Sequence, residues 1–121
     1  MQNITIERIE RYYEYSKRII SDELTKSEVK NILNNTMGMN TSSSDAYINA
    51  YLAMRKGEIY KRTINECATN YYVQHIYEEN GVEALKLALQ SIKEHINYYS
   101  QQHKGKLRSI QNIYDEYISK S

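Results

Sequence analysis

Basic residues gather at two places in the chain, each beside a glycine. Around Gly57 they are opposed only by Glu58, and this first basic group, interleaved with tyrosine, consists of Arg55, Lys56, Tyr60, Lys61 and Arg62. Around Gly105, beside His103, the second basic group consists of Lys104, Lys106 and Arg108. Lys and Arg contact nucleic-acid phosphates and tyrosine can stack on bases, so both groups predict a surface that binds DNA. The alternative is that they are solvated charges that oppose the negative ends of helices.

Residues that could bind a metal or catalyse a reaction are few and poorly spaced. His75 and Glu79 are four residues apart, which places two metal ligands on one helical face, but the sequence nominates no third ligand. His95 directly follows Glu94, so these two side chains point apart. Cys67 falls at a core position of its helix and is expected to be a small buried residue. It is not expected to act as a nucleophile, because His75 is too distant along a straight helix to act as its base. We therefore expect no enzyme, no metal and no cofactor.

Tyrosine is the only aromatic residue besides histidine, and it occurs 13 times. Three adjacent pairs stand out: Tyr12 and Tyr13, Tyr71 and Tyr72, Tyr98 and Tyr99. Neighbouring residues on a helix diverge by about 100°, so one member of each pair is expected to be buried and the other to lie near the surface. An exposed tyrosine can contact a protein or stack on a base, although a place at the rim of the core is the simpler interpretation.

The length and cysteine content predict the class of protein. A chain of 121 residues has the size of one domain, and we expect a single helical domain over residues 1–121. One cysteine cannot form an internal disulfide, which indicates a cytoplasmic protein. The first residues mix charged and apolar groups, unlike a signal peptide, and no apolar run could cross a membrane. Met1 and the polar Ser121 favour a complete protein.

Helices are the expected secondary structure throughout. Proline is absent and only four glycines are present, which favours long helices with few breaks. Apolar residues recur at three- and four-residue intervals, and no strand pattern competes. The expected helices cover residues 4–20, 26–35, 45–56, 64–80, 82–101 and 107–117. Short connections between amphipathic helices predict an all-α fold, a compact bundle of five or six helices.

Several helix ends and core stripes can be assigned from residue type. Capping boxes are expected at Thr25 with Glu28 and at Thr63 with Glu66, because each side chain of such a pair binds the other's backbone N–H. The third helix is expected to start at a Ser44 cap after a loop at 36–43. Expected core stripes are Ile6, Ile9, Tyr13 and Ile20; Ile64, Cys67, Tyr71 and His75 or Ile76; and Leu85, Ala88, Leu89, Ile92, Ile96 and Tyr99. Gly57 and Gly81 are expected to end helices, Gly81 in the left-handed conformation.

The stretch from Ser44 to Tyr117 resembles a known family. The segments SDAYINAYLAMRKGEIYKRT, ATNYYVQHIYEENGVEALKLALQSIKEHINYY and GKLRSIQNIYDEY are similar to a helical module that precedes the nuclease domain in some bacterial HNH-type, restriction-like endonucleases. The resemblance implies a target-engaging or regulatory part of a defence system. It does not imply cleavage, because this chain has neither the β-hairpin nor the metal-binding residues of an HNH nuclease.

The expected function is therefore binding. We expect a non-enzymatic helical module of a bacterium or mobile element that contacts DNA or a DNA-handling or defence protein, and no membrane. One alternative is a small phage or mobile-element inhibitor that blocks a host defence protein, in the manner of an anti-CRISPR protein. A further alternative is a homodimeric structural or assembly protein that pairs through the long apolar seam of residues 82–101.

Overall fold

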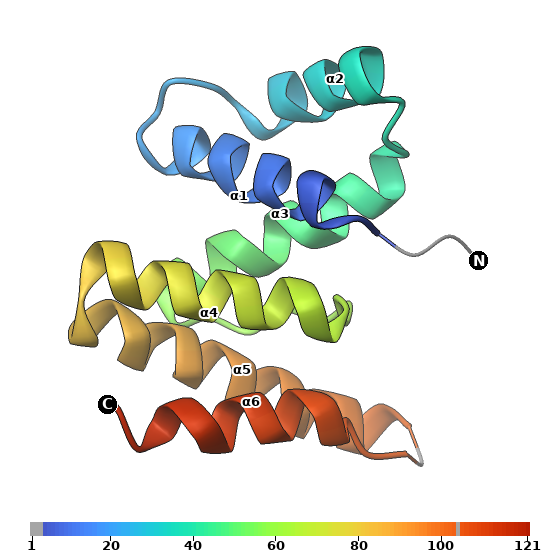
Figure 1. Ribbon diagram of the computed structural model, residues 1–121. Coiled ribbons are helices and arrows are strands. Elements are labelled where there is room, and N and C mark those ends of the chain that lie inside the picture. Colours follow the sequence, from blue (N-terminus) through green and yellow to red (C-terminus); the bar gives the residue numbers. More distant parts are fainter. Residues whose placement is uncertain (1–3, 104) are drawn as a thin grey trace. The chain divides into compact units, whose positions relative to one another are not determined.

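The computed structural model describes residues 4–103 and 105–121, and all regular structure within these ranges is helical. The six helices are α1 (Ile6–Ile20), α2 (Lys26–Met37), α3 (Thr41–Lys56), α4 (Glu66–Asn80), α5 (Val82–Gln102) and α6 (Arg108–Ile118) (Figure 1). The all-α fold predicted from the sequence is confirmed. Where chain length predicted one domain, the contacts divide the chain into two compact units, Met1–Leu52 and Ala53–Ser121, called here the N-terminal and C-terminal units. None of the described helices is both long and apolar enough to cross a membrane.

The core of the N-terminal unit is built from tyrosine rings. Tyr12 stacks on Tyr47 with ring centres 4.9 Å apart, and Tyr13 meets Tyr51 edge to face at 5.2 Å. Tyr12 and Tyr13 are both buried, so the prediction that one member of this pair lies at the surface is wrong. The reason is that α1 buries two adjacent positions, each against a different ring of α3. The predicted stripe also fails at its two ends, because Ile6 and Ile20 are exposed.

Helix ends in the N-terminal unit follow local capping chemistry. The capping box of Thr25 and Glu28 is confirmed by hydrogen bonds in both directions, of 2.9 and 3.2 Å. The predicted Ser44 cap is wrong, because α3 begins three residues earlier and the Asn40 side chain accepts hydrogen bonds from the backbone N–H groups that follow it. Ser44 is instead buried, with its hydroxyl 3.2 Å from that of Tyr12. The predicted loop at 36–43 therefore shortens to residues 38–40.

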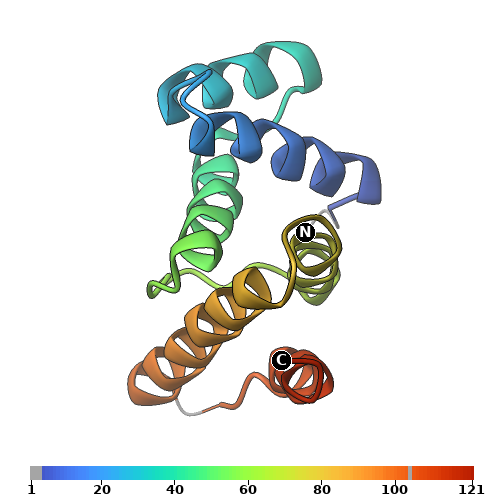
Figure 2. The same ribbon diagram turned by 90° about the vertical axis from the view of Figure 1, so that its left-hand side faces the viewer.

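The C-terminal unit contains α4, α5 and α6, each of which contacts the other two (Figure 2). The predicted seam of α5 is confirmed at its four buried members, Leu85, Ala88, Leu89 and Ile92. The predicted stripe of α4 is confirmed at Ile64 and Ile76, which are buried, but is wrong at Cys67, which is exposed. The buried face of the helix consists of Ala68, Thr69, Tyr72, Val73 and Ile76. The predicted capping box of Thr63 and Glu66 is also wrong, because Asn65 caps α4 and accepts a 2.8 Å hydrogen bond from the N–H of Ala68.

Two glycines form the turns that orient the helices of this unit. Gly57 directly follows α3 with φ of 70°, as its predicted role requires. Gly81 lies between α4 and α5 with φ of 88° and ψ of −174°, so its positive φ was predicted correctly but its conformation is extended rather than left-handed helical. One residue therefore ends α4 and starts α5, and the two helices run antiparallel (Figure 1).

Candidate functional site

The connection between α3 and α4, residues 57–65, is anchored along one side of α5. Ser91 donates a 2.6 Å hydrogen bond from its hydroxyl to the carbonyl oxygen of Glu58. One turn further along α5, the Nδ1 atom of His95 lies 2.6 Å from the carbonyl oxygen of Tyr60. Both α5 side chains are buried. These contacts give the irregular connection a fixed path over the helix, so its side chains have defined positions.

His95 holds the middle of this connection through both of its ring nitrogens. A carbonyl oxygen can only accept, so Nδ1 carries the proton and donates to Tyr60, and Nε2 accepts from the Thr63 hydroxyl at 2.9 Å. The Tyr60 ring stacks on the imidazole with centres 4.3 Å apart. Burial lowers the pKa of His95, partly opposed by the hydrogen bond to the Tyr60 backbone, so the ring is held neutral. The histidine is a positioning residue, and it leaves neither ring nitrogen for acid–base chemistry.

Tyr60 does not belong to an exposed basic surface, contrary to the prediction. Its side chain is only 5% exposed, and burial raises the pKa of its hydroxyl far above the ordinary value. The ring is occupied by His95, on which it stacks. Tyr60 therefore supports the connection from inside and cannot stack on a ligand at the surface.

The anchored connection separates the first basic group into two parts. Arg55 lies in the last turn of α3 and places its Nη2 atom 3.4 Å from Oδ1 of Asn80, the last residue of α4. Lys61 lies near the opposite end of α5, with its Nζ atom 5.7 Å from the centre of the Tyr98 ring. The exposed basic members are Lys56, Lys61 and Arg62. The members of the first basic group therefore lie at two separate locations and not on one shared surface, as was predicted.

The second basic group borders a cavity between the C-terminal part of α5 and the start of α6. The cavity has a volume of about 350 Å³ and is lined by Ile96, Tyr99, Ser100, Gly105, Lys106, Leu107, Arg108, Gln111 and Asn112. Lys106 and Arg108 are both exposed. Lys104, the third predicted member of the group, lies outside the described residues. Two of the three predicted cations are thus brought to one concave site.

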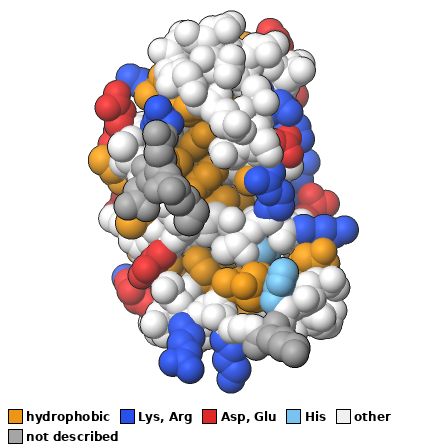
Figure 3. Space-filling model, turned by 90° about the vertical axis from the view of Figure 1, so that its right-hand side faces the viewer, with side chains coloured by type: hydrophobic (Ala, Val, Ile, Leu, Met, Phe, Trp, Pro, Cys, Tyr) orange, Lys and Arg blue, Asp and Glu red, His pale blue; other side chains and the backbone are white. Residues whose placement is uncertain are grey.

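The chain path gathers cations at one end of the C-terminal unit. Because α4, α5 and α6 run alternately in opposite directions, the start of α4, the end of α5 and the start of α6 lie together (Figure 1). Lys61 precedes α4, and Lys106 and Arg108 lie at the start of α6. We call these three residues the cationic end. On the face drawn in Figure 3, blue Lys and Arg side chains and a pale blue His border orange apolar side chains in the lower part of the view.

Carboxylates gather at the other end of the same three helices. The acidic residues near the turn between α4 and α5 and in the second half of α6 are Glu78, Glu79, Glu83, Asp115 and Glu116. Burial, followed by the charges of Glu116 and Glu78, raises the pKa of Tyr117. Cations lie at this end as well, since Lys86 pairs with Glu83 and Arg55 lies beside Asn80.

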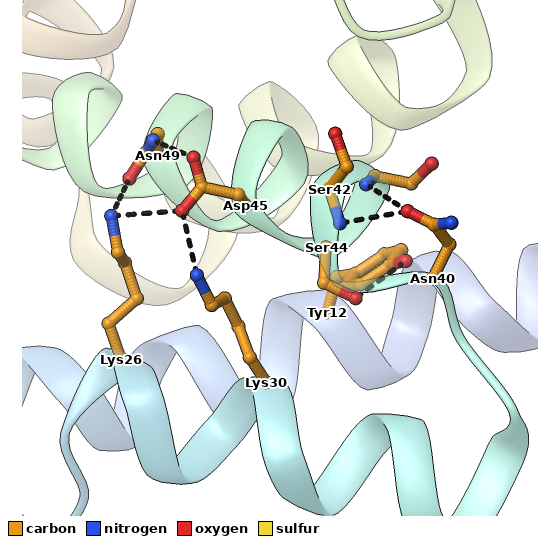
Figure 4. A network of polar contacts seen from close by, with 9 residues as sticks. Tyr12, Lys26, Lys30, Asn40, Ser42, Ser44, Asp45 and Asn49 are labelled. Atoms are coloured by element: carbon orange, nitrogen blue, oxygen red, sulfur yellow. Dashed lines mark hydrogen bonds and ion pairs between the residues drawn. The ribbon is translucent and has the colours of Figure 1, made fainter.

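Lysines of the N-terminal unit are arranged differently. Lys26 and Lys30 on α2 place their Nζ atoms 3.1 and 3.3 Å from Oδ1 of Asp45, and Asn49 bonds both Lys26 and Asp45 (Figure 4). By contrast, Lys61, Lys106 and Arg108 form no ion pair with any carboxylate in the described ranges. The charges of the cationic end are therefore not neutralised by a carboxylate within the described ranges.

The candidates for metal binding and nucleophilic chemistry are not assembled into a metal site within the described residues. His75 and Glu79 do share a face of α4, with Nδ1 and Oε2 3.9 Å apart, and the His75 ring lies on that of Tyr71. Among residues 4–103 and 105–121, however, no group of three His, Cys, Asp or Glu side chains could hold a metal ion. Cys67 was expected in the core but is exposed, because the face of α4 that packs into the core carries Ala68, Thr69, Tyr72, Val73 and Ile76 instead.

The other two tyrosine pairs match the predicted pattern of burial only in part. Tyr72 is buried and Tyr71 half-buried, broadly as predicted, whereas Tyr98 and Tyr99 are both half-buried. Tyr98 contacts Lys61, and Tyr99 lines the cavity with its ring 4.4 Å from that of His103. Sequence reasoning missed the anchoring role of His95, because its partners lie more than thirty residues away and no periodic pattern connects them.

No protein-family model matches the sequence, and no curated protein or solved structure is significantly similar to it.

Proposed function

We propose that this chain is a non-enzymatic helical module that binds DNA through the cationic end of its C-terminal unit. The observation that carries the proposal is that Lys61, Lys106 and Arg108 are exposed and form no ion pair with a described carboxylate. Phosphate groups of DNA are closely spaced anions, and their neutralisation by Lys and Arg supplies most of the affinity of sequence-independent binding. A DNA-handling or defence protein that presents a similarly anionic surface is the protein version of the same proposal.

Three features of the site support binding rather than catalysis. The connection that carries Lys61 is held rigidly by His95 and Ser91, so this cation is placed before a ligand arrives. Lys106 and Arg108 border a concave site, which brings two cations to one place on the surface. The buried histidine has both nitrogens engaged by the protein itself, so it positions the chain and performs no proton transfer.

The salt dependence of DNA binding tests the proposal. Fluorescence anisotropy with a labelled duplex should show binding at low salt, and neutralising three phosphates predicts an affinity loss of about 40-fold between about 50 and about 200 mM salt. Absence of binding at low salt would contradict the DNA version. In that case, pull-down from a bacterial lysate and light scattering would test the two alternatives predicted from the sequence, an inhibitor of a defence protein and a homodimer.

A further inference from the structure

The cavity between α5 and α6 combines three kinds of contact that a single nucleotide requires. We propose that it holds one unpaired nucleotide, with its base inside and its phosphate between Lys106 and Arg108, which rests on and deepens the proposed function. The site is assembled from the last turns of α5, the start of α6 and residues 105–107 between them. It lies at the cationic end, so a bound DNA strand passes its mouth.

The walls of the cavity suit a flat heterocycle. Tyr99 contributes an aromatic ring, and the contact with the His103 ring at 4.4 Å fixes the orientation of that tyrosine. Ile96 and Leu107 supply apolar surface. Stacking of a base on an aromatic side chain contributes about 1–3 kcal/mol and tolerates any of the four bases. These side chains therefore favour the base rather than the sugar as the inserted part.

Two amide side chains supply groups that can bind the edge of a base. Gln111 donates from Nε2 to Oδ1 of Asp115 at 2.9 Å, which fixes its amide and leaves its carbonyl oxygen as an acceptor. Asn112, the next residue, is exposed and also lines the cavity. Amides pair with the donors and acceptors that an unpaired base presents on its edges. The combination of amides, an aromatic ring and cations is specific to a nucleotide, since a simple phosphate uses only the cations.

The size of the cavity distinguishes an unpaired nucleotide from a duplex. Its volume of about 350 Å³ is at the lower end of the range for small-ligand sites, about 300–1,000 Å³, and it admits one base with its phosphate. A base inside a duplex is stacked and paired, and entering a pocket would require it to leave the stack at a cost of a few kcal/mol. The cavity therefore predicts a preference for single-stranded ends over blunt duplex, and a free mononucleotide has the same chemistry.

The test compares three probes on the full chain by fluorescence anisotropy at low salt: a blunt duplex, the same duplex with an unpaired overhang, and the overhang duplex in competition with adenosine monophosphate. We expect the overhang to bind at least about 10-fold more tightly than the blunt duplex, because one stacked base contributes 1.4 kcal/mol or more. The mononucleotide should displace the overhang duplex, because both place a base and a phosphate in the same cavity.

Two variants assign the preference to the cavity. Tyr99→Leu removes the stacking surface and should reduce overhang affinity to that of the blunt duplex, while blunt-duplex affinity stays within about twofold. Asn112→Glu places a carboxylate in the cavity, at an exposed position that folding tolerates, and should weaken binding of the overhang duplex more than binding of the blunt duplex. Asn31→Glu makes the identical change at an exposed position of α2 and should leave all affinities unchanged. Circular dichroism checks that each variant is folded.

The outcomes separate this inference from the proposed function. Equal affinity for overhang and blunt duplex, with no effect of Tyr99→Leu, would overturn the nucleotide site and leave DNA binding intact. Binding of adenosine monophosphate without binding of any DNA would support the nucleotide site as one for free nucleotides and overturn the proposed DNA binding. Absence of binding to every probe would overturn both.

Discussion

The two units of the chain contain similar residues but use their lysines in opposite ways. The N-terminal unit has six Lys and Arg against seven Asp and Glu, and the C-terminal unit has ten against eight. In the first, Lys26 and Lys30 converge on Asp45; in the second, Lys61, Lys106 and Arg108 have no described carboxylate partner. The net charges of the two units differ only slightly, so they do not show which lysines are paired with a carboxylate. Whether a lysine serves folding or binding is decided by its neighbours in space.

The two units also differ in how they bury polar groups. The N-terminal unit places the hydroxyls of Tyr12 and Ser44 together inside its core, 3.2 Å apart. The C-terminal unit buries an imidazole that binds an irregular segment through both nitrogens. Because the core of the C-terminal unit contains His95, we expect this unit to lose stability at a higher pH than the N-terminal unit when the solution is acidified.

Neutralising the cationic end should produce the largest effect. We expect the triple variant Lys61→Gln, Lys106→Gln, Arg108→Gln to weaken binding to a DNA duplex about 100-fold at low salt and to reduce the salt slope by about 3, because three phosphate contacts are lost. Anisotropy titrations at several salt concentrations measure both quantities.

A matched control removes the same number of cations from the N-terminal unit. Lys17, Lys26 and Lys30 each form an ion pair, with Glu14 or Asp45. Changing these three to Gln should leave affinity for DNA within about threefold, since only the overall charge changes. Equal losses in the two triple variants would show that net charge, not the cationic end, governs binding.

Glycine substitutions should separate the units by stability. Gly38 and Gly57 have similar φ angles of 64° and 70°, so an alanine costs about 1 kcal/mol at either position. A Cβ atom at Gly57 would in addition lie 2.9 Å from Cδ2 of Leu87, whereas the space around Gly38 is open. We expect Gly57→Ala to lower the free energy of unfolding by about 2 kcal/mol and Gly38→Ala by about 1 kcal/mol.

Urea unfolding of both variants measures the difference. Leu87→Ala in the Gly57→Ala background should recover the additional cost, because the side chain that obstructs the new methyl group is shortened. If Gly57→Ala and Gly38→Ala cost the same, Leu87 rotates away freely and the two turns are energetically equivalent.

Mild acid should destabilise the C-terminal unit first. Burial lowers the pKa of His95 below its ordinary value of 6.5, so below that pH the unfolded chain binds a proton that the folded chain does not. The stabilisation is complete above pH 6.5 and is lost by about 1.4 kcal/mol per pH unit as the pH falls toward the folded-state pKa. Residue-resolved hydrogen exchange should show this loss in α4, α5 and the connection before α4, and His95→Gln should remove it.

The N-terminal unit should respond at lower pH and by a smaller amount. Partial burial acts to raise the pKa of Asp45, but hydrogen bonds and charges from Lys26 and Lys30 hold it below the ordinary value of 3.8. Its stabilisation is therefore present above pH 3.8 and lost as the pH falls through the folded-state value. Asp45→Asn should cost about 1 kcal/mol at neutral pH. A loss of N-terminal protection already near pH 6 would contradict this assignment.

The smallest expected effect is a gain of stability. The hydroxyl of Ser16 is buried within α1 and has no hydrogen-bond partner among the described residues. Ser16→Ala removes this cost and raises helix propensity, so thermal unfolding should show a stabilisation of up to about 1 kcal/mol. A destabilised Ser16→Ala variant would indicate that this hydroxyl has a partner in solution.

Most of the secondary structure could be predicted because it depends on neighbours in the chain. The spacing of apolar residues located all six helices, and the bounds of α5 were predicted to within one residue. The capping box at Thr25 was predictable because both partners lie three residues apart. At α4 two residues were possible caps, and the prediction chose Thr63 where the structure uses Asn65.

The candidate site was predicted only as a list of cations. Residue types identified Lys61, Lys106 and Arg108, but grouped Lys61 with Arg55 and treated Tyr60 as an exposed partner. The structure moves Tyr60 into the core and brings Lys61 to the end of α5 that also carries the cavity. Gln111 and Asn112 had no distinguishing pattern, because polar residues on an exposed helical face look alike until a cavity forms beside them.

The sequence by itself determined the helices, their approximate ends and the positions at which cations cluster, because these depend on interactions within a few residues. Only the tertiary structure decided which lysines are neutralised, that His95 fixes residues 57–65 along α5, and that α5 and α6 enclose a cavity. Those outcomes depend on contacts between residues far apart in the chain, for which local periodicity contains no information.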